Sequence, residues 1–232
     1  MAEQKIIGLY VGGTLGELTG SMTIRGRRAM AVQHVCAAAH FARSAKLIED
    51  AHAGEAFGGF FDEIIWNVSA SVLMSCNAIE ANINETLMDQ AEDVPVTEEM
   101  KAKLHTIIAD KTLSIFSKYE CLAGLRGAKL EKGRSAYQNA QLLVGMRNEL
   151  VHFRSEWTDE TGQHANLSKK LLGKFGRNPF LPNEASIFPL ACFSYACAKW
   201  SVKAATGFVA EFSKIVGLPN RFEASSARLS LS

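Results

Sequence analysis

The sequence predicts an all-α protein, because apolar residues recur three or four positions apart through most of it. The chain has 232 residues, of which 47% are hydrophobic and only five are proline. We expect one helical domain of five to seven helices over residues 26–220. A short strand-like arm of residues 1–25 precedes it, and a tail of residues 221–232 follows it.

The first two helices are predicted from their apolar spacing. An Ala-rich stretch with apolar residues on one side indicates a helix over residues 27–52, which the Gly-rich segment 54–59 ends. A longer helix is expected over residues 60–92, just before Pro95. Its apolar stripe consists of Ile64, Val68, Val72, Cys76, Ile79, Ile83 and Leu87.

The next helical stretch starts from a capping residue. Thr97 is a good N-cap, and the two glutamates that follow it suit the positive end of a helix dipole. The helical pattern continues to about Leu125, with a break near Asp110. A Gly-rich basic loop over residues 124–134 then separates this stretch from the next helix.

Two further helices are predicted near the C-terminus. Ser135 and Gln138 have capping-box spacing, so we expect a helix from residue 135 to about Arg154. "ANLSKKLLGKF" indicates a short helix, and the Pro-rich stretch after it should be irregular. Pro189 suits the first turn of the last helix, and Gly217 suits its end.

Composition limits the classes of function. The formal net charge of +1 excludes a histone-like nucleic-acid binder and an acidic tail protein. The five cysteines form no C-x-x-C motif and lie mostly in apolar runs, so we expect buried reduced thiols. No group of residues has metal-ligand spacing, and neither a metal nor a cofactor is expected. No signal peptide or uninterrupted membrane-length apolar run is apparent, which predicts a soluble cytoplasmic protein without a membrane partner.

The stretch "RNELVH" places an Arg, an Asn and a His within six residues of the expected helix 135–154. Asn148 and His152 are four residues apart and share the face opposite the apolar stripe. That face is uncharged and contains small residues, which is typical of contact with a partner subunit. Arg147 lies about 140° around the helix from His152, so a second copy of the helix brings an Arg to this His more easily. The stripe that we expect in the core consists of Leu143, Met146, Leu150 and Phe153.

The segment from Arg147 to His152 resembles the signature of the HEPN superfamily, in which an Arg, usually a polar residue and a few more residues precede a His. In that family the motif lies on a late helix of a compact helical bundle, and the same position is expected here. The stretch "SCNAIEANINETL" (75–87) is similar to the Glu/Asn-rich early helix of many members. The resemblance covers residues 27–155 and implies a HEPN-like helical bundle.

The resemblance also implies a function. Many HEPN proteins are metal-independent endoribonucleases whose site forms across a homodimer, in toxin–antitoxin, phage-defence and RNA-processing systems. By this resemblance His152 is the general acid/base, Arg147 stabilises the phosphate and Asn148 positions both. The implied partners are RNA, a second copy of the chain, and an antitoxin or regulatory protein. Some HEPN toxins carry a Tyr two residues after the His as the target of nucleotide attachment; here Arg154 stands there, which argues against that regulation.

Several other residues are weaker candidates. Glu80 and Asn84 share one face of the helix 60–92, where they either line the cleft of His152 or face water. Two basic groups flank the motif helix, and each either contacts RNA phosphates or forms a solvated surface, the simpler interpretation. The first group consists of Arg126, Lys129, Lys132 and Arg134, with Arg154 after the motif; the second consists of Lys169, Lys170, Lys174 and Arg177. The remaining histidines, His164 among them, are given no role.

A second class of function remains open. A HEPN-like bundle can keep its fold without catalysis and serve as a binding or regulatory module for a nucleotide or a protein partner. An unrelated helical protein is the third interpretation. RNA cleavage that depends on His152 distinguishes the first class from the other two.

Overall fold

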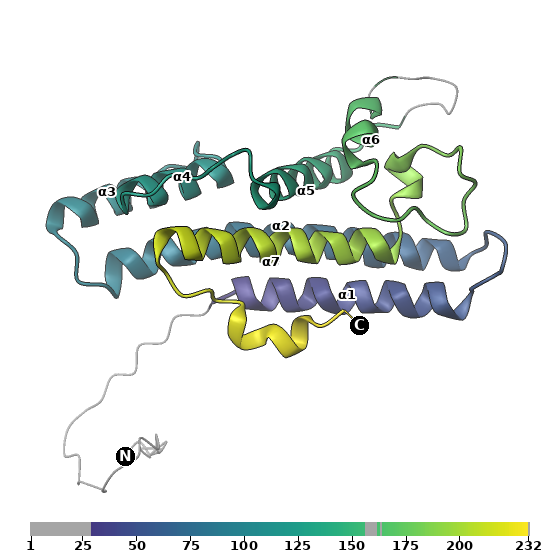
Figure 1. Ribbon diagram of the computed structural model, residues 1–232, viewed down its shortest axis with the longest axis horizontal. Coiled ribbons are helices and arrows are strands. Elements are labelled where there is room, and N and C mark those ends of the chain that lie inside the picture. The colour runs from purple at the N-terminus through teal and green to yellow at the C-terminus, as the bar shows by residue number, and fades with distance from the viewer. Residues whose placement is uncertain (1–28, 156–161, 163, 232) are drawn as a thin grey trace, which may run out of the picture.

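The computed structural model describes residues 29–155, 162 and 164–231, and over these residues it is all-helical without a strand (Figure 1). The predicted all-α class is therefore confirmed. The arm of residues 1–25, predicted to be strand-like, lies outside the described residues.

Three long helices form the centre of the fold: α1 (Ala31–Ala51), α2 (Phe60–Glu92) and α7 (Tyr195–Val216). They run side by side in Figure 1, and their contacts with one another dominate the packing. Five alanines of α1 are fully buried, which lets the helix axes approach closely. Where the three helices meet, the hydroxyl of Ser71 donates to the carbonyl of Ala38 at 3.0 Å.

A second layer consists of α3 (Glu98–Ala109), α4 (Ile115–Leu125) and α5 (Ser135–Val151). Figure 1 shows these helices following one another along the three-helix core. The predicted cap is confirmed, because the Thr97 hydroxyl accepts from the Met100 N–H at 3.2 Å. The predicted break near Asp110 is also confirmed, and Ser114 caps α4. Tyr119 of α4 is fully buried and donates to the carbonyl of Ile79 at 2.8 Å, which ties the two layers together.

The motif helix α5 begins where expected, but for a different reason. The prediction of a capping box at Ser135 and Gln138 is wrong, because Arg134 is the N-cap and no side chain caps the helix. The end is also earlier than predicted, at Val151 rather than Arg154. Phe153 therefore lies beyond the helix and is 46% exposed, instead of belonging to the core stripe. The stripe is otherwise as expected, since Leu143 and Met146 are fully buried and Leu150 is partly buried.

The last third contains α6 (Ala165–Leu171), a π-helical turn η1 (Ile187–Ala191), α7 and a 3-10 helix η2 (Glu223–Leu229). The prediction that α7 starts at Pro189 is wrong. The Phe188–Pro189 peptide is cis and Phe188 has extended backbone angles, so the chain turns before Ser194 caps α7. The predicted end is confirmed at Gly217, whose φ of 66° places it in the left-handed region that glycine favours.

The C-terminal tail folds back onto α1. The guanidinium of Arg43 donates to the carbonyls of Arg228 and Ser230, each at 3.0 Å. Figure 1 shows η2 alongside α1, on the side away from the α3–α5 layer.

Among the described helices, only α2 has the length and the mean hydropathy, 1.2 over 18 residues, of a membrane-spanning helix. Polar residues such as Asn67, Ser75 and Glu80 interrupt this helix, so it is not the uninterrupted apolar run whose absence was expected. In the structure 44% of that 18-residue window is buried inside the bundle, and one helix of this kind is weak evidence for a membrane span.

Candidate active site

Asn148 and His152 lie together on the outer face of α5, as their spacing predicts. Both are exposed, and the His152 N–H donates to the Asn148 carbonyl at 2.9 Å, which closes the last turn of the helix. Among the described residues, the His152 imidazole has no hydrogen-bond partner. Gly145 lies one turn earlier on this face, and a Cβ there would meet no heavy atom within 4 Å. The outer face of α5 is therefore open to an approaching molecule, and the His152 imidazole at its end has no hydrogen-bond partner among the described residues.

Arg147 points in a different direction, from α5 toward α2. Its Nη2 atom lies 3.8 Å from Oε2 of Glu80, and its side chain is 24% exposed. Its Nε atom is buried and has no hydrogen-bond partner within the described part of the chain. A guanidinium has five N–H donors, so this long ion pair leaves much of its donor capacity unused.

Cys76 of α2 lies beside the same guanidinium. Its thiol donates to the carbonyl of Leu143 at 3.5 Å. Burial raises the pKa of Cys76 to about 12, although the positive charge of Arg147 acts in the opposite direction. The thiol is therefore protonated at neutral pH, and it is no candidate nucleophile.

The structure brings Arg147 to Glu80 but not to the His152 of the same chain. No hydrogen bond or ion pair joins the two motif residues in the described ranges, and they leave α5 in different directions. Asn84, the other weak candidate on α2, accepts a hydrogen bond from Lys118 at 2.9 Å. Asn84 is thus tied to α4, whereas Glu80 is the α2 residue that reaches the motif.

The basic loop before α5 uses most of its charges within the protein. Arg126 donates from Nε to the Val216 carbonyl at 2.7 Å and from Nη1 to Gln90 at 2.9 Å, which holds the end of α7. Lys132 lies 2.8 Å from Glu120. Arg134 lies 2.8 Å from Glu131 and 3.6 Å from Glu211, and Lys129 is exposed.

The second basic group and Arg154 lie at the other end of α5. Arg154 is exposed one residue after Phe153. Lys169 and Lys170 form the last turn of α6, and Lys174 follows it; all three are exposed. Arg177 instead donates to the carbonyl of Ala185 and so has an internal partner. The lysines of this group are therefore freer to meet a ligand than the cations of the basic loop.

Sequence reasoning gave His164 no role, but the structure places it against the end of the motif helix. Its side chain is 2% exposed, and its Nδ1 atom lies 3.3 Å from Oε2 of Glu149. Its Nε2 atom donates to the Arg154 carbonyl at 3.0 Å. No local spacing could have indicated this contact, because His164 lies more than ten positions after Val151, the last residue of α5, in sequence.

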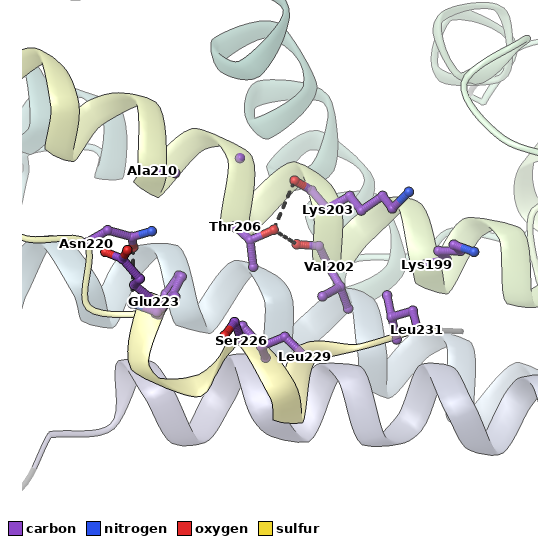
Figure 2. Close-up of a pocket in the computed structure, with 12 residues that line it drawn as sticks. Lys199, Val202, Lys203, Thr206, Ala210, Asn220, Glu223, Ser226, Leu229 and Leu231 are labelled. Atoms are coloured by element: carbon purple, nitrogen blue, oxygen red, sulfur yellow. Dashed lines mark hydrogen bonds between the residues drawn. The ribbon is translucent and has the colours of Figure 1, made fainter.

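A groove of about 720 Å³ runs between α7 and η2, away from the motif residues. Figure 2 shows Lys199 and Lys203 on its α7 wall, with Asn220 and Glu223 toward the opposite end. None of the candidate residues on α2 or α5 lines it, so it forms no part of the candidate active site.

In the described ranges no three His, Cys, Asp or Glu residues are grouped so that they could hold a metal ion. Comparison of the chain with family models, with curated proteins and with solved structures finds no match.

Proposed function

We propose that the protein is a homodimeric, metal-independent endoribonuclease of the HEPN type that cleaves single-stranded RNA. The observation that carries the proposal is the pair Asn148 and His152, exposed together on the outer face of α5. A partly buried Arg147 directly precedes Asn148. A toxin or phage-defence role, with an antitoxin or regulatory partner and a cytoplasmic location, belongs to the same proposal through the resemblance of the motif.

The chemistry needs a base, an acid and a cation. The imidazole of His152 removes the proton from a ribose 2′-OH, and the 2′ oxygen attacks the adjacent phosphorus. The bond between phosphorus and the 5′ oxygen then breaks, and the imidazolium returns the proton to that oxygen. The products are a 2′,3′-cyclic phosphate and a 5′-hydroxyl, so atoms and charge balance without another reactant.

Arg147 supplies the positive charge for the phosphate. Its pair with Glu80 is long, and the Glu80 side chain is 47% exposed. A pair of this kind is weak, about 0–1 kcal/mol. A phosphate offers more negative charge and a geometry that fits the guanidinium fork, and it gains further charge in the transition state. RNA can therefore compete with Glu80 for Arg147.

The directions of the two motif side chains support the dimer. Within one chain Arg147 extends toward α2, whereas His152 is exposed at the end of α5. In a two-fold dimer each contact occurs twice, so the Arg147 of one copy can serve the His152 of the other. Gly145 supports this arrangement, because its lack of a side chain permits close approach to the outer face of α5.

The central test is cleavage of a labelled single-stranded RNA in excess EDTA. We expect a product that ends in a 2′,3′-cyclic phosphate, and a rate about 10²- to 10⁴-fold lower for His152→Ala. His40→Ala, at an exposed histidine of α1, is the matched control and should keep the wild-type rate. Absence of wild-type cleavage, or equal cleavage by His152→Ala, would contradict the proposal.

Mixing two inactive variants tests the shared site. Arg147→Ala and His152→Ala should each be inactive. In a 1:1 mixture that exchanges subunits, half of all dimers contain one copy of each variant, and each of these holds one intact Arg–His pair. We expect recovery of about a quarter of the wild-type rate, since each such dimer has one of two sites. A mixture that stays inactive while exchanging subunits, or a chain that is strictly monomeric in solution, would exclude a site shared between copies.

A second candidate function is a non-catalytic HEPN-like module that binds a nucleotide or a protein partner. The contact between Arg147 and Glu80 favours it, because the Arg already has a partner within its own chain. Such a module should bind without cleavage, and Glu80→Ala should change its affinity while His152→Ala leaves it unchanged. Cleavage that depends on His152 would exclude it.

A further inference from the structure

Phe153 is an exposed aromatic residue directly after the catalytic candidate His152. Its ring is 46% exposed, although a Phe normally avoids water. The exposure arises because α5 ends at Val151, two residues before the position where the apolar stripe would have buried this ring. The chain thus presents a large flat apolar group beside the proposed active site.

One face of this ring is held by the protein. The His164 imidazole stacks on Phe153, with 5.1 Å between ring centroids and 6° between planes. His164 is itself buried at 2% exposure, and Phe188 packs on it edge to face at 5.1 Å. His164 covers one face of Phe153 and Phe188 lies 6.3 Å away at a tilt of 58°, and with both neighbours in place 46% of the residue remains exposed.

The support under the ring is held by one hydrogen bond. His164 donates from Nε2 to the Arg154 carbonyl at 3.0 Å, whereas its buried Nδ1 atom lies 3.3 Å from the carboxylate of Glu149 without a hydrogen bond. The hydrogen bond joins His164 to the backbone directly after Phe153. The ring is therefore positioned before any ligand arrives, which reduces the entropy lost on binding.

Three exposed cations lie near the ring along the chain. Arg154 is its direct neighbour and is exposed. The helix α6 begins immediately after His164, and Lys169 and Lys170 lie about 8–9 Å further along its axis. Both lysines are exposed, and in the described ranges neither has a carboxylate within ion-pair distance. An exposed aromatic face among unpaired cations is the combination that binds single-stranded nucleic acid, in which bases stack and phosphates stay accessible.

We infer that Phe153, backed by His164, is a stacking platform for one base of single-stranded RNA, with Arg154 and the α6 lysines contacting the flanking phosphates; this inference rests on the proposed function. A base in a duplex has both faces covered by its neighbours and cannot stack on this ring. The platform thus provides a physical reason for a single-stranded substrate. It also holds the strand next to His152, which follows Val151 at the end of the motif helix.

The test uses an RNA that binds but cannot be cleaved. A fluorescein-labelled 12-nucleotide oligouridylate with 2′-O-methyl groups lacks the attacking hydroxyl, so anisotropy measures its affinity alone. Phe153→Ala should weaken binding by about 5- to 100-fold, the effect of removing one base–aromatic stack. Phe153→Tyr keeps an aromatic face and should bind like the wild type.

Phe57→Ala is the matched control. Phe57 is 56% exposed and packs on Phe61 with 4.6 Å between centroids, so it is a similar ring at a different place. Its removal should leave the affinity unchanged. Thermal unfolding of each variant shows whether the bundle is intact.

The possible results separate the platform from the nuclease. Loss of binding in a folded Phe153→Ala, with rescue by Tyr, supports the platform even if natural RNA is never cleaved. Cleavage of natural RNA together with unchanged binding by Phe153→Ala would overturn the platform and leave the nuclease in place. A wild-type protein that does not bind the 12-mer, or binds a protein partner through this ring instead, would also overturn it.

Discussion

The Nη2 atom of Arg147 lies 3.8 Å from the Oε2 atom of Glu80, across the contact between α5 and α2. This ion pair joins the motif helix to the Glu/Asn-rich helix that precedes it in the chain. It also means that the cation expected to hold RNA is partly neutralised in the free protein. The carboxylate of Glu80 therefore competes with the phosphate for the same guanidinium.

Removing this competitor should strengthen RNA binding. We expect Glu80→Gln to raise the affinity for the uncleavable 12-mer by about two- to fivefold, which corresponds to the weak energy of a half-exposed ion pair. The Gln keeps the size of the side chain, so the free energy of unfolding should change by less than about 0.5 kcal/mol. Fluorescence anisotropy and urea unfolding measure the two quantities.

Glu63→Gln is the control for the change in net charge. Glu63 is exposed in the first turn of α2 and has no ion-pair partner in the described ranges. Equal gains in affinity from both variants would show a general charge effect, with no special role for the pair of Glu80 and Arg147.

The α6 lysines should determine part of the salt dependence of RNA binding. Each phosphate contact in a single strand contributes about 0.7 to the slope of log K against log salt concentration. The double change Lys169→Gln and Lys170→Gln should therefore lower the magnitude of the slope by up to about 1.4. Anisotropy titrations at several salt concentrations give this slope.

Lys199→Gln with Lys203→Gln is the matched lysine pair. These two residues line the groove between α7 and η2 and are four residues apart on one helix. The same loss of slope from both pairs would mean that the lysines attract RNA only through net charge, which would contradict a defined path over α6.

Much of the fold could be predicted from the sequence because its signals are local. The bounds of α2 agree with the prediction at residues 60–92, since apolar periodicity and flanking glycines and a proline define them. Thr97 is a cap for reasons contained in four residues. Pro189 misled the prediction for α7, because its neighbour Phe188 packs into the core at 1% exposure with an extended backbone. That burial depends on distant residues, which local rules do not include.

The candidate site likewise has one part that could be predicted from local spacing and one part that depends on how the helices pack. The shared outer face of Asn148 and His152 follows from a spacing of four and needs only helical geometry. The contact of Arg147 with Glu80 depends on how α5 packs on α2, and a single sequence does not contain that information. His164 was missed for the same reason, because its partners Glu149 and Phe153 lie more than ten positions earlier in the chain.

Burial of Cys76 predicts a loss of stability at alkaline pH. Its pKa is raised from 9.0 to about 12 in the folded protein. Above pH 9 the unfolded chain ionises this thiol while the folded chain keeps it neutral, so unfolding becomes easier up to about pH 12. In this window the thiol alone lowers the free energy of unfolding by about 1.4 kcal/mol for each pH unit.

Urea unfolding between pH 7 and 11 measures this slope. Cys76→Ala should make the pH dependence less steep, whatever stability it loses at neutral pH. A slope should remain, because burial also raises the pKa of Cys192, Cys197, Tyr119 and Tyr137. Ser75→Ala changes a buried neighbour that has no titratable group in this range, and its curve should stay parallel to the wild type. If the Cys76→Ala curve is also parallel, the thiol does not cause the alkaline loss.

Changes at His164 should separate the stability of the α5 end from RNA binding. His164→Ala removes a buried ring from the stack with Phe153 and leaves the Arg154 carbonyl without its donor. We expect a loss of about 2–3 kcal/mol in the free energy of unfolding, together with weaker binding of the 12-mer.

His164→Phe keeps an aromatic ring under Phe153 but loses the hydrogen bond. It should therefore lose stability and still bind RNA nearly as well as the wild type, because stacking supports the platform while the hydrogen bond anchors the backbone at Arg154. Urea unfolding and anisotropy on both variants give the comparison. Weak binding by His164→Phe in a folded protein would mean that the imidazole acts through its nitrogens rather than its flat face.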